Sequence, residues 1–126
     1  MMSFSIINFD IYYNILIFSP LAVFFIELND ELIVATSEGI TRVLESEYSD
    51  YDFEINSVPN ISALAIDSDH TIWAGSYGQG LFFLSGNDTF VQFQGFKEHK
   101  LPNQLNIQDI HLDHRQRLWL ATYGEN

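Results

Sequence analysis

Cysteine and basic residues are what this sequence lacks most clearly. None of its 126 residues is Cys, which excludes a disulfide framework and a thiolate metal site. Five Lys and Arg stand against 17 Asp and Glu, for a formal net charge of -12. Nucleic acid and anionic membrane surfaces are bound through clustered Lys and Arg, so neither is expected as a partner. A neutral or cationic ligand suits this charge better than a polyanion.

Helical periodicity is also missing. No window places apolar residues at i, i+3, i+4 and i+7 between helix breakers. Apolar residues are nevertheless 47% of the chain, with 11 Phe, which excludes a solvated, disordered chain. Short apolar runs between Gly, Asn and Asp turns therefore predict an all-β fold with a sizeable core.

An apolar run, Ile11–Ile26, lies near the N-terminus. No Lys or Arg precedes Arg42, so the positive region of a signal peptide is missing. Asn14 and Pro20 interrupt the run, which leaves it short of the roughly 20 apolar residues that a spanning helix needs. We expect neither a recognisable signal peptide nor membrane insertion by this segment.

An internal repeat organises the chain. In each copy an apolar stretch ends in an acid, a short polar turn follows, and an apolar tetrad closes on Thr or Ser before a Gly-bearing turn. The copies are LAVFFIELNDELIVATSEG (21–39), ISALAIDSDHTIWAGSYGQG (61–80) and IQDIHLDHRQRLWLATYGEN (107–126).

The spacing of the copies indicates the architecture. The tetrads centre on Ile33, Trp73 and Trp119, which are 40 and 46 positions apart. A period of about 40–50 residues is typical of a four-stranded β-propeller blade. Asp67 and Asp113 recur at one place in the repeat. Recurrence at equivalent turns predicts hydrogen bonds from these carboxylates to the backbone, not catalysis.

The second copy shows the expected strands most clearly. Gly86-Asn87-Asp88 is a strong hairpin signal, and apolar residues occupy both faces of the first two strands, as they do in a blade covered by two neighbours. Trp73 and Trp119 are expected to fill the space between blades, and the small residues Ala35, Gly75 and Ala121 to let the next blade approach. The predicted strands are Ile61–Asp67, Thr71–Tyr77, Leu81–Ser85 and Thr89–Gln94.

These copies resemble the two-component regulator propeller repeat over residues 20–126. The third copy carries Leu101-Pro102-Asn103, then Asp113, then Leu118-Trp119-Leu120-Ala121-Thr122. The second carries Val58-Pro59-Asn60, then Asp67, then Ile72-Trp73-Ala74-Gly75-Ser76 and Gly78-Gln79-Gly80-Leu81. The first copy departs most, since Ile33 replaces the Trp. The Gly expected before the Trp strand is Asp30, His70 or Gln116, so these turns need another route to a residue with positive φ.

The resemblance implies a periplasmic or otherwise extracytoplasmic sensor region of seven blades. Such regions usually precede a signalling module such as a histidine kinase or a diguanylate cyclase, and relatives often sense carbohydrates. We therefore expect a non-catalytic, ligand-binding sensor propeller. The alternative is a structural or protein-interaction propeller with no small-molecule ligand.

The chain accounts for about two and a half blades. Residues 21–60 are assigned to blade 1, 61–106 to blade 2 and 107–126 to the first half of blade 3, while residues 1–20 end a preceding blade or are irregular. So few blades cannot close a ring. We expect a truncated gene product, an excised piece or one portion of an assembled ring, whose partners are the remaining blades or another copy of the chain, with a glycan as the candidate ligand.

Ligand contacts are expected from the blade connectors and from the turns after the Trp strands, by analogy with the family. Aromatic rings and amides suit sugar faces and hydroxyls. An ordinary role as exposed turn residues remains open for each of them. The candidates are Tyr77, Gln79, Asn103, Gln104 and Tyr123.

Other motifs have simpler interpretations. Residues 75–80 (GSYGQG) invite a phosphate-loop hypothesis, but a strand follows them instead of the required helix. His111 and His114 lie three apart, so on a strand they face opposite ways. His111 aligns with Ala65 and Phe25 and is expected to be buried or to line the pore. No metal site, cofactor or catalytic group is predicted, and the acidic residues 45–54 are expected to form a solvated outer strand and connector.

Overall fold

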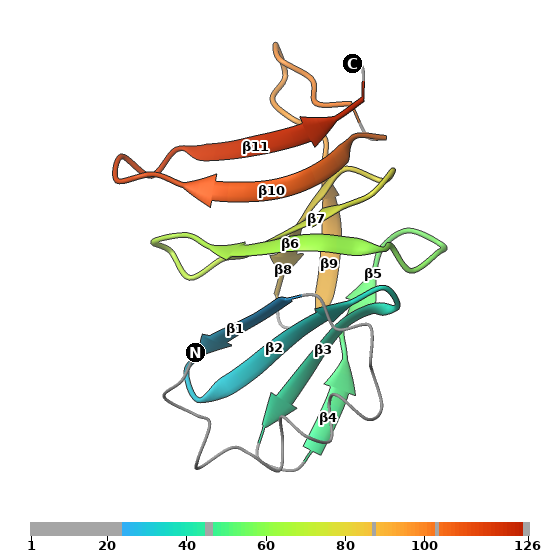
Figure 1. The fold of residues 1–126 in the computed structure, drawn as a ribbon, viewed down its shortest axis with the longest axis vertical. Helices are drawn as coiled ribbons and strands as arrows, with labels where there is room; N and C mark the ends of the chain where they lie inside the picture. Colours follow the sequence, from blue (N-terminus) through green and yellow to red (C-terminus); the bar gives the residue numbers. More distant parts are fainter. Residues whose placement is uncertain (1–23, 45–46, 87, 103, 125–126) are drawn as a thin grey trace.

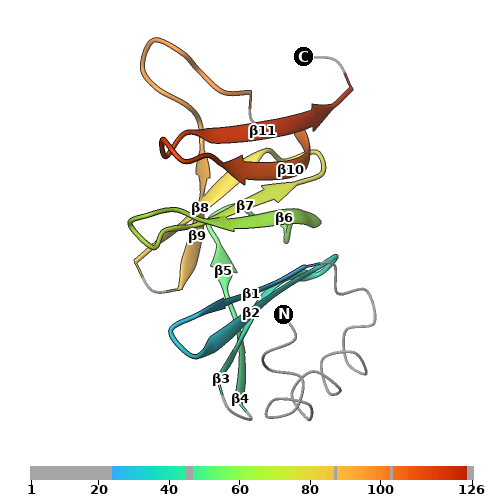
Figure 2. The same ribbon diagram turned by 60° about the vertical axis from the view of Figure 1, so that its left-hand side comes forward.

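The chain folds into three successive β-sheets that lie one above the other (Figures 1 and 2). The computed structural model describes residues 24–44, 47–86, 88–102 and 104–124. All regular elements in these ranges are strands, which confirms the predicted all-β fold. Within the same ranges, no helix could cross a membrane. The boundaries predicted at residues 20, 60 and 106 remain predictions, and residues 1–20 lie outside the described part.

The first sheet runs in the order β1 (Phe24–Leu28), β2 (Glu31–Thr36), β3 (Gly39–Leu44) and β4 (Glu47–Asp50), with antiparallel neighbours. Asn29 and Asp30 join β1 to β2 with φ values of 53° and 68°. Two positive φ angles in a two-residue connection are typical of a type I′ turn, which suits the twist of a hairpin. All of β4 is exposed, as predicted for the acidic outer strand.

The second sheet contains β6 (Ile61–Ile66), β7 (Ile72–Ser76), β8 (Leu81–Ser85) and β9 (Thr89–Phe93). These strands confirm the four predicted for the second copy, shortened by one residue at four of their ends. A further strand, β5 (Asp52–Phe53), pairs in parallel with β9. The connector from the first sheet therefore adds a short fifth strand to the second, which the sequence pattern did not reveal.

The third sheet comprises β10 (Asn106–Leu112) and β11 (Leu118–Tyr123) in the described residues. Its register repeats that of β6 and β7. Ile107 pairs with Thr122 as Ile61 pairs with Ser76, and an irregularity follows each pair.

This register corrects one part of the sequence alignment. Because Ile61 and Ile107 are equivalent, Asn60 corresponds to Asn106. Val58-Pro59-Asn60 therefore lies at the place of residues 104–106, three positions after Leu101-Pro102-Asn103. The sequence match paired two similar tripeptides at different distances from the strand, because the connector before β10 is longer.

The second sheet is covered by apolar side chains on both faces, as predicted. Between the first and second sheets, Ile33, Ala35 and Ile40 pack with a group from the second sheet and its connector: Tyr51, Ile61, Leu64, Ile72, Ala74, Phe82 and Phe90. Between the second and third sheets, the buried residues are Ala63, Leu81, Leu105, Ile107 and Ile110, with Trp73 partly buried against them.

Gly75 allows the third sheet to approach the second closely. A Cβ atom on Gly75 would lie 2.5 Å from Ile107 Cγ2, closer than carbon atoms can pack. The buried Ser62 hydroxyl also donates a hydrogen bond to the Ile107 carbonyl across the same interface. The predicted role of a small residue at this position is confirmed for Gly75.

The connector after β4 is less solvated than predicted. Tyr51 is 7% exposed, and its ring lies edge-on to Phe90 at 5.3 Å. Phe53 is half-buried and stacks on Phe90 at the same centroid distance of 5.3 Å. Two aromatic residues among the acids of residues 45–54 therefore anchor the connector to the second sheet.

Candidate functional site

The predicted ligand residues that the structure describes lie at one end of the sheets, where β7 and β11 stop and β6 and β10 begin; we call this the connector end (right in Figure 1). Tyr77 forms an isolated antiparallel bridge with Asn106, and Asn106 pairs in turn with Tyr123. The three residues therefore form a row from the residue that follows β7, across β10, to the end of β11. Tyr77 is 49% exposed and Tyr123 66% exposed, so two large rings are available to solvent there.

The turn between β7 and β8 is fastened to the connector that precedes β10. The N–H groups of Gly78 and Gly80 both donate to the Leu105 carbonyl, at 3.1 and 3.0 Å. Their φ values of 92° and 80° lie in the region that Gly adopts without steric cost. The strand β8 follows, which confirms the turn interpretation of residues 75–80 over a phosphate loop.

Gln79 is more enclosed than its neighbours. It is half-buried, and its side-chain Nε2 donates to Ser57 Oγ at 3.0 Å. Its carbonyl accepts from Gln92 Nε2 at 2.8 Å, while its Oε1 is buried without a hydrogen-bond partner in the described structure. Gln104 is exposed next to the buried Leu105, and Asn103 lies outside the described residues.

The opposite ends of the sheets, which we call the turn end, carry the recurring aspartates. Asp67 Oδ1 accepts from the N–H groups of Asp69 and Thr71, at 2.9 and 3.0 Å. Its Oδ2 accepts from Trp73 Nε1 at 2.9 Å. Burial alone would raise the pKa of Asp67, but these hydrogen bonds outweigh it and hold the pKa below its ordinary value.

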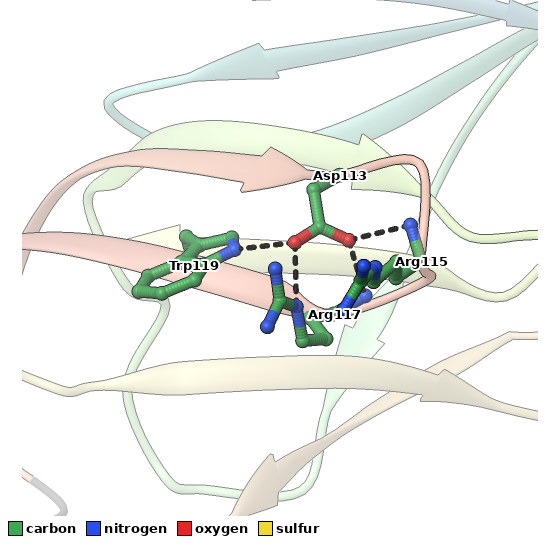
Figure 3. Close-up of polar contacts among 4 residues, drawn as sticks. All are labelled: Asp113, Arg115, Arg117 and Trp119. Atoms are coloured by element: carbon green, nitrogen blue, oxygen red, sulfur yellow. Dashed lines mark hydrogen bonds and ion pairs between the residues drawn. The ribbon is translucent and has the colours of Figure 1, made fainter.

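Asp113 repeats this arrangement in the third sheet (Figure 3). Its Oδ1 accepts from the N–H groups of Arg115 and Arg117, at 2.8 and 3.0 Å. Its Oδ2 accepts from Trp119 Nε1 at 2.8 Å and from Arg117 Nε at 2.7 Å. The bond from Trp119 is the main reason that the pKa of Asp113 lies well below its ordinary value.

The predicted hydrogen bonds from these two carboxylates to the backbone are present in both turns. His70 and Gln116 stand where the family repeat has Gly, and they adopt φ values of 64° and 65°. Each therefore takes the left-handed conformation itself, and no other residue of the turn replaces the Gly. The bond to the Trp indole was not foreseen. Its signal was the identical spacing of six positions from Asp67 to Trp73 and from Asp113 to Trp119.

The two histidines of the third copy lie on different elements, His111 on β10 and His114 in the turn that follows it. His111 pairs with Trp119 and is exposed, so it is not buried, and the alternative that it lines the pore remains a prediction. His111 is equivalent to Ala65 in the second sheet, as the alignment predicted. The equivalent residue in the first sheet is Ile26 and not Phe25, because the β1–β2 turn is shorter. No group of three potential metal ligands lies together within the described ranges.

Comparison with known proteins supports the predicted repeat and fold. Residues 100–124 match the family model described as two-component regulator propeller. The structure is similar to the extracellular domain of BT4673 from B. thetaiotaomicron, described as a hybrid two-component system, with a TM-score of 0.61 and 18% identity. It is also similar to the corresponding domain of BT3049 from the same organism, with a TM-score of 0.60 and 23% identity. No curated protein matches the chain.

The matches cover most of this chain but little of the larger domains. They include 78% and 80% of this chain, and 14% of each of the two solved chains. The resemblance to the two-component regulator propeller repeat is confirmed, and the fold is a partial β-propeller in which the three sheets are blades.

Proposed function

We propose that this partial propeller, which carries a two-component regulator repeat, belongs to an extracytoplasmic sensor domain and binds a neutral ligand at its connector end. The observation that carries this proposal is the row formed by Tyr77, Asn106 and Tyr123. The row spans two adjoining blades and presents two exposed tyrosines. A ligand bound across this row would contact both blades at once. Such contact is required if ligand binding is to change how the two blades pack.

The chemistry of this surface favours a carbohydrate. Aromatic faces pack against the apolar faces of sugar rings, and phenol and amide groups bond to hydroxyls. The net charge of -12 disfavours polyanions. A non-catalytic role also fits the turn end, because Asp67 and Asp113 are already bonded within their turns and catalysis needs unlike groups that converge.

A protein-interaction role is supported by a different observation. Trp119 is 54% exposed, although the equivalent Trp73 packs against the third blade. We propose that the face of β11 that bears Trp119 is covered by a further blade or by another copy of the chain. Size-exclusion chromatography coupled to light scattering tests this; a monomer at all concentrations counts against coverage by another copy.

Titration of the chain with a panel of neutral oligosaccharides, followed by calorimetry, tests the ligand proposal. Y77A and Y123A should each weaken binding by about tenfold or more, since each removes one stacking face. Y48A is the matched control, because Tyr48 is a similarly exposed tyrosine (41%) on β4 and should leave binding unchanged. No heat with any glycan, or equal losses in all three variants, would refute the proposal.

A further inference from the structure

The two inter-blade spaces differ at equivalent positions. In the second sheet, Trp73 pairs across strands with Phe83, and the two rings lie 5.5 Å apart. In the first sheet, the equivalent pair is Ile33 and Arg42. Two aromatic rings are thus replaced by a smaller aliphatic side chain and by a guanidinium that seeks polar partners.

A partly open cavity of about 160 Å³ is lined by Ile33 and Arg42, the two residues that replace these rings. Ile33, Ile72 and Leu84 supply apolar lining, and Arg42 and Tyr51 supply polar and aromatic lining. Asn29, Glu31 and His70 also border it, which places it at the turn end. It is therefore separate from the connector-end row described above.

The charges around this cavity restrict what it can hold. The Arg42 guanidinium lies 5.0 Å from the centre of the Tyr51 ring. Its Nη2 is 3.2 Å from Asp88 Oδ1, and its Nε is 4.0 Å from Glu31 Oε1. Two carboxylates thus neutralise one cation, so the cavity disfavours an anion. The Arg42 guanidinium, which lies over the buried Tyr51 ring, offers a planar face for a ring to stack on.

We propose that this cavity binds a small planar ring of the indole class, neutral or cationic and with an N–H donor. The cavity is partly open to solvent and has both polar and apolar lining, and its volume of about 160 Å³ has room for a single small ring system. In the adjoining interface, the equivalent space is filled by the indole of Trp73, whose N–H donates to a carboxylate. Glu31 offers a carboxylate at the border of the cavity.

Indole itself is the probe. Titrated into the ¹⁵N-labelled chain, it should shift the amide resonances of Ile33, Ile72 and Leu84 and leave those of Tyr77 and Tyr123 unchanged. I33W should fill the space, raise the melting temperature and weaken indole binding by about tenfold or more. I33F, with a smaller ring, provides a second test if I33W does not fold.

L44W is the matched control, because Leu44 is 45% exposed on β3 and a Trp there fills no cavity. L44W should bind indole like the parent chain. Absence of shifts at millimolar indole would overturn the proposal, as would equal binding by I33W or I33F and the parent chain. Neither result bears on glycan binding at the connector end, so this inference and the proposed function fail independently.

Discussion

The turns of blades 2 and 3 make the same hydrogen bonds in different surroundings. Asp67 bonds to Trp73 Nε1 at 2.9 Å, and Asp113 bonds to Trp119 Nε1 at 2.8 Å. Trp73 is half-buried and contacts Phe83 and Phe93. Trp119 is 54% exposed and has the Arg117 guanidinium 5.4 Å from its ring.

The comparison separates local from tertiary effects. Both turns reach the same geometry whether or not a neighbouring blade covers the Trp, so each turn is specified by its own residues. Burial, in contrast, depends on what packs against the sheet. Equivalent substitutions in the two blades should therefore differ strongly when they affect packing and little when they affect only the turn.

Replacing the two tryptophans should give the largest contrast. W73A should lower the free energy of unfolding by about 3 kcal/mol, because it leaves a cavity between blades 2 and 3. W119A should lower it by less than about 1 kcal/mol, since an exposed ring buries little. Urea unfolding of both variants measures the difference; equal losses would contradict the assignment of Trp73 to a packed interface.

The small residues after the tryptophans give the next largest contrast. G75A places a methyl group against Ile107 Cγ2 and should destabilise the chain by about 2 kcal/mol through overpacking. Ala121 occupies the equivalent position in an exposed setting, so A121V should change stability by less than about 0.5 kcal/mol. If G75A unfolds at the same urea concentration as the parent chain, blades 2 and 3 are not in close contact in solution.

The residues with positive φ should respond alike in both blades. H70G and Q116G each relieve a left-handed conformation of a non-glycine residue, so each should stabilise the chain by about 1 kcal/mol. The two gains should agree, because the strain lies within the turn. Thermal unfolding measures them, and a gain in only one blade would show that packing also sets the turn geometry.

The smallest effect should be on the pH dependence of the melting temperature, when either turn aspartate is replaced. Asp67 and Asp113 have pKa values below their ordinary range in the folded chain, so their stabilising contribution is complete above about pH 4 and is lost as the pH falls through the folded pKa. D67N and D113N should each make the melting temperature less dependent on pH between pH 6 and 3. Solvent screening keeps the D113N effect small. Unchanged pH dependence in both variants would argue against the carboxylate bonds.

The sequence predicted the architecture because the repeat encodes it directly. The Asp and Trp spacing and the alternation of apolar residues in residues 61–94 are local signals, and the strands they predicted are those observed. The placement of Tyr77 and Tyr123 after the Trp strands followed from the same repeat, and a ligand role at that end was expected by analogy with the family.

Features that depend on distant segments were not predictable in this way. The pairing of β5 with β9 joins residues 37 positions apart, and no local sequence pattern predicts it. The exposure of His111 depends on what covers the third sheet. Alignment of His111 with apolar residues of the other copies does not show whether such a cover is present. The cavity beside Ile33 required knowledge of which side chains face each other across two blades.

The pairing of β5 with β9 also has a consequence for biosynthesis. Asp52 and Phe53 leave the ribosome well before Thr89 and Phe90, their partners. Until those residues emerge, the Tyr51 and Phe53 rings have no Phe90 to pack on, and their apolar surface is open to non-native association. The acidic residues that flank them oppose such association through charge repulsion. The same short segment therefore joins the first sheet to the second in the folded chain and carries the charges that limit aggregation during synthesis.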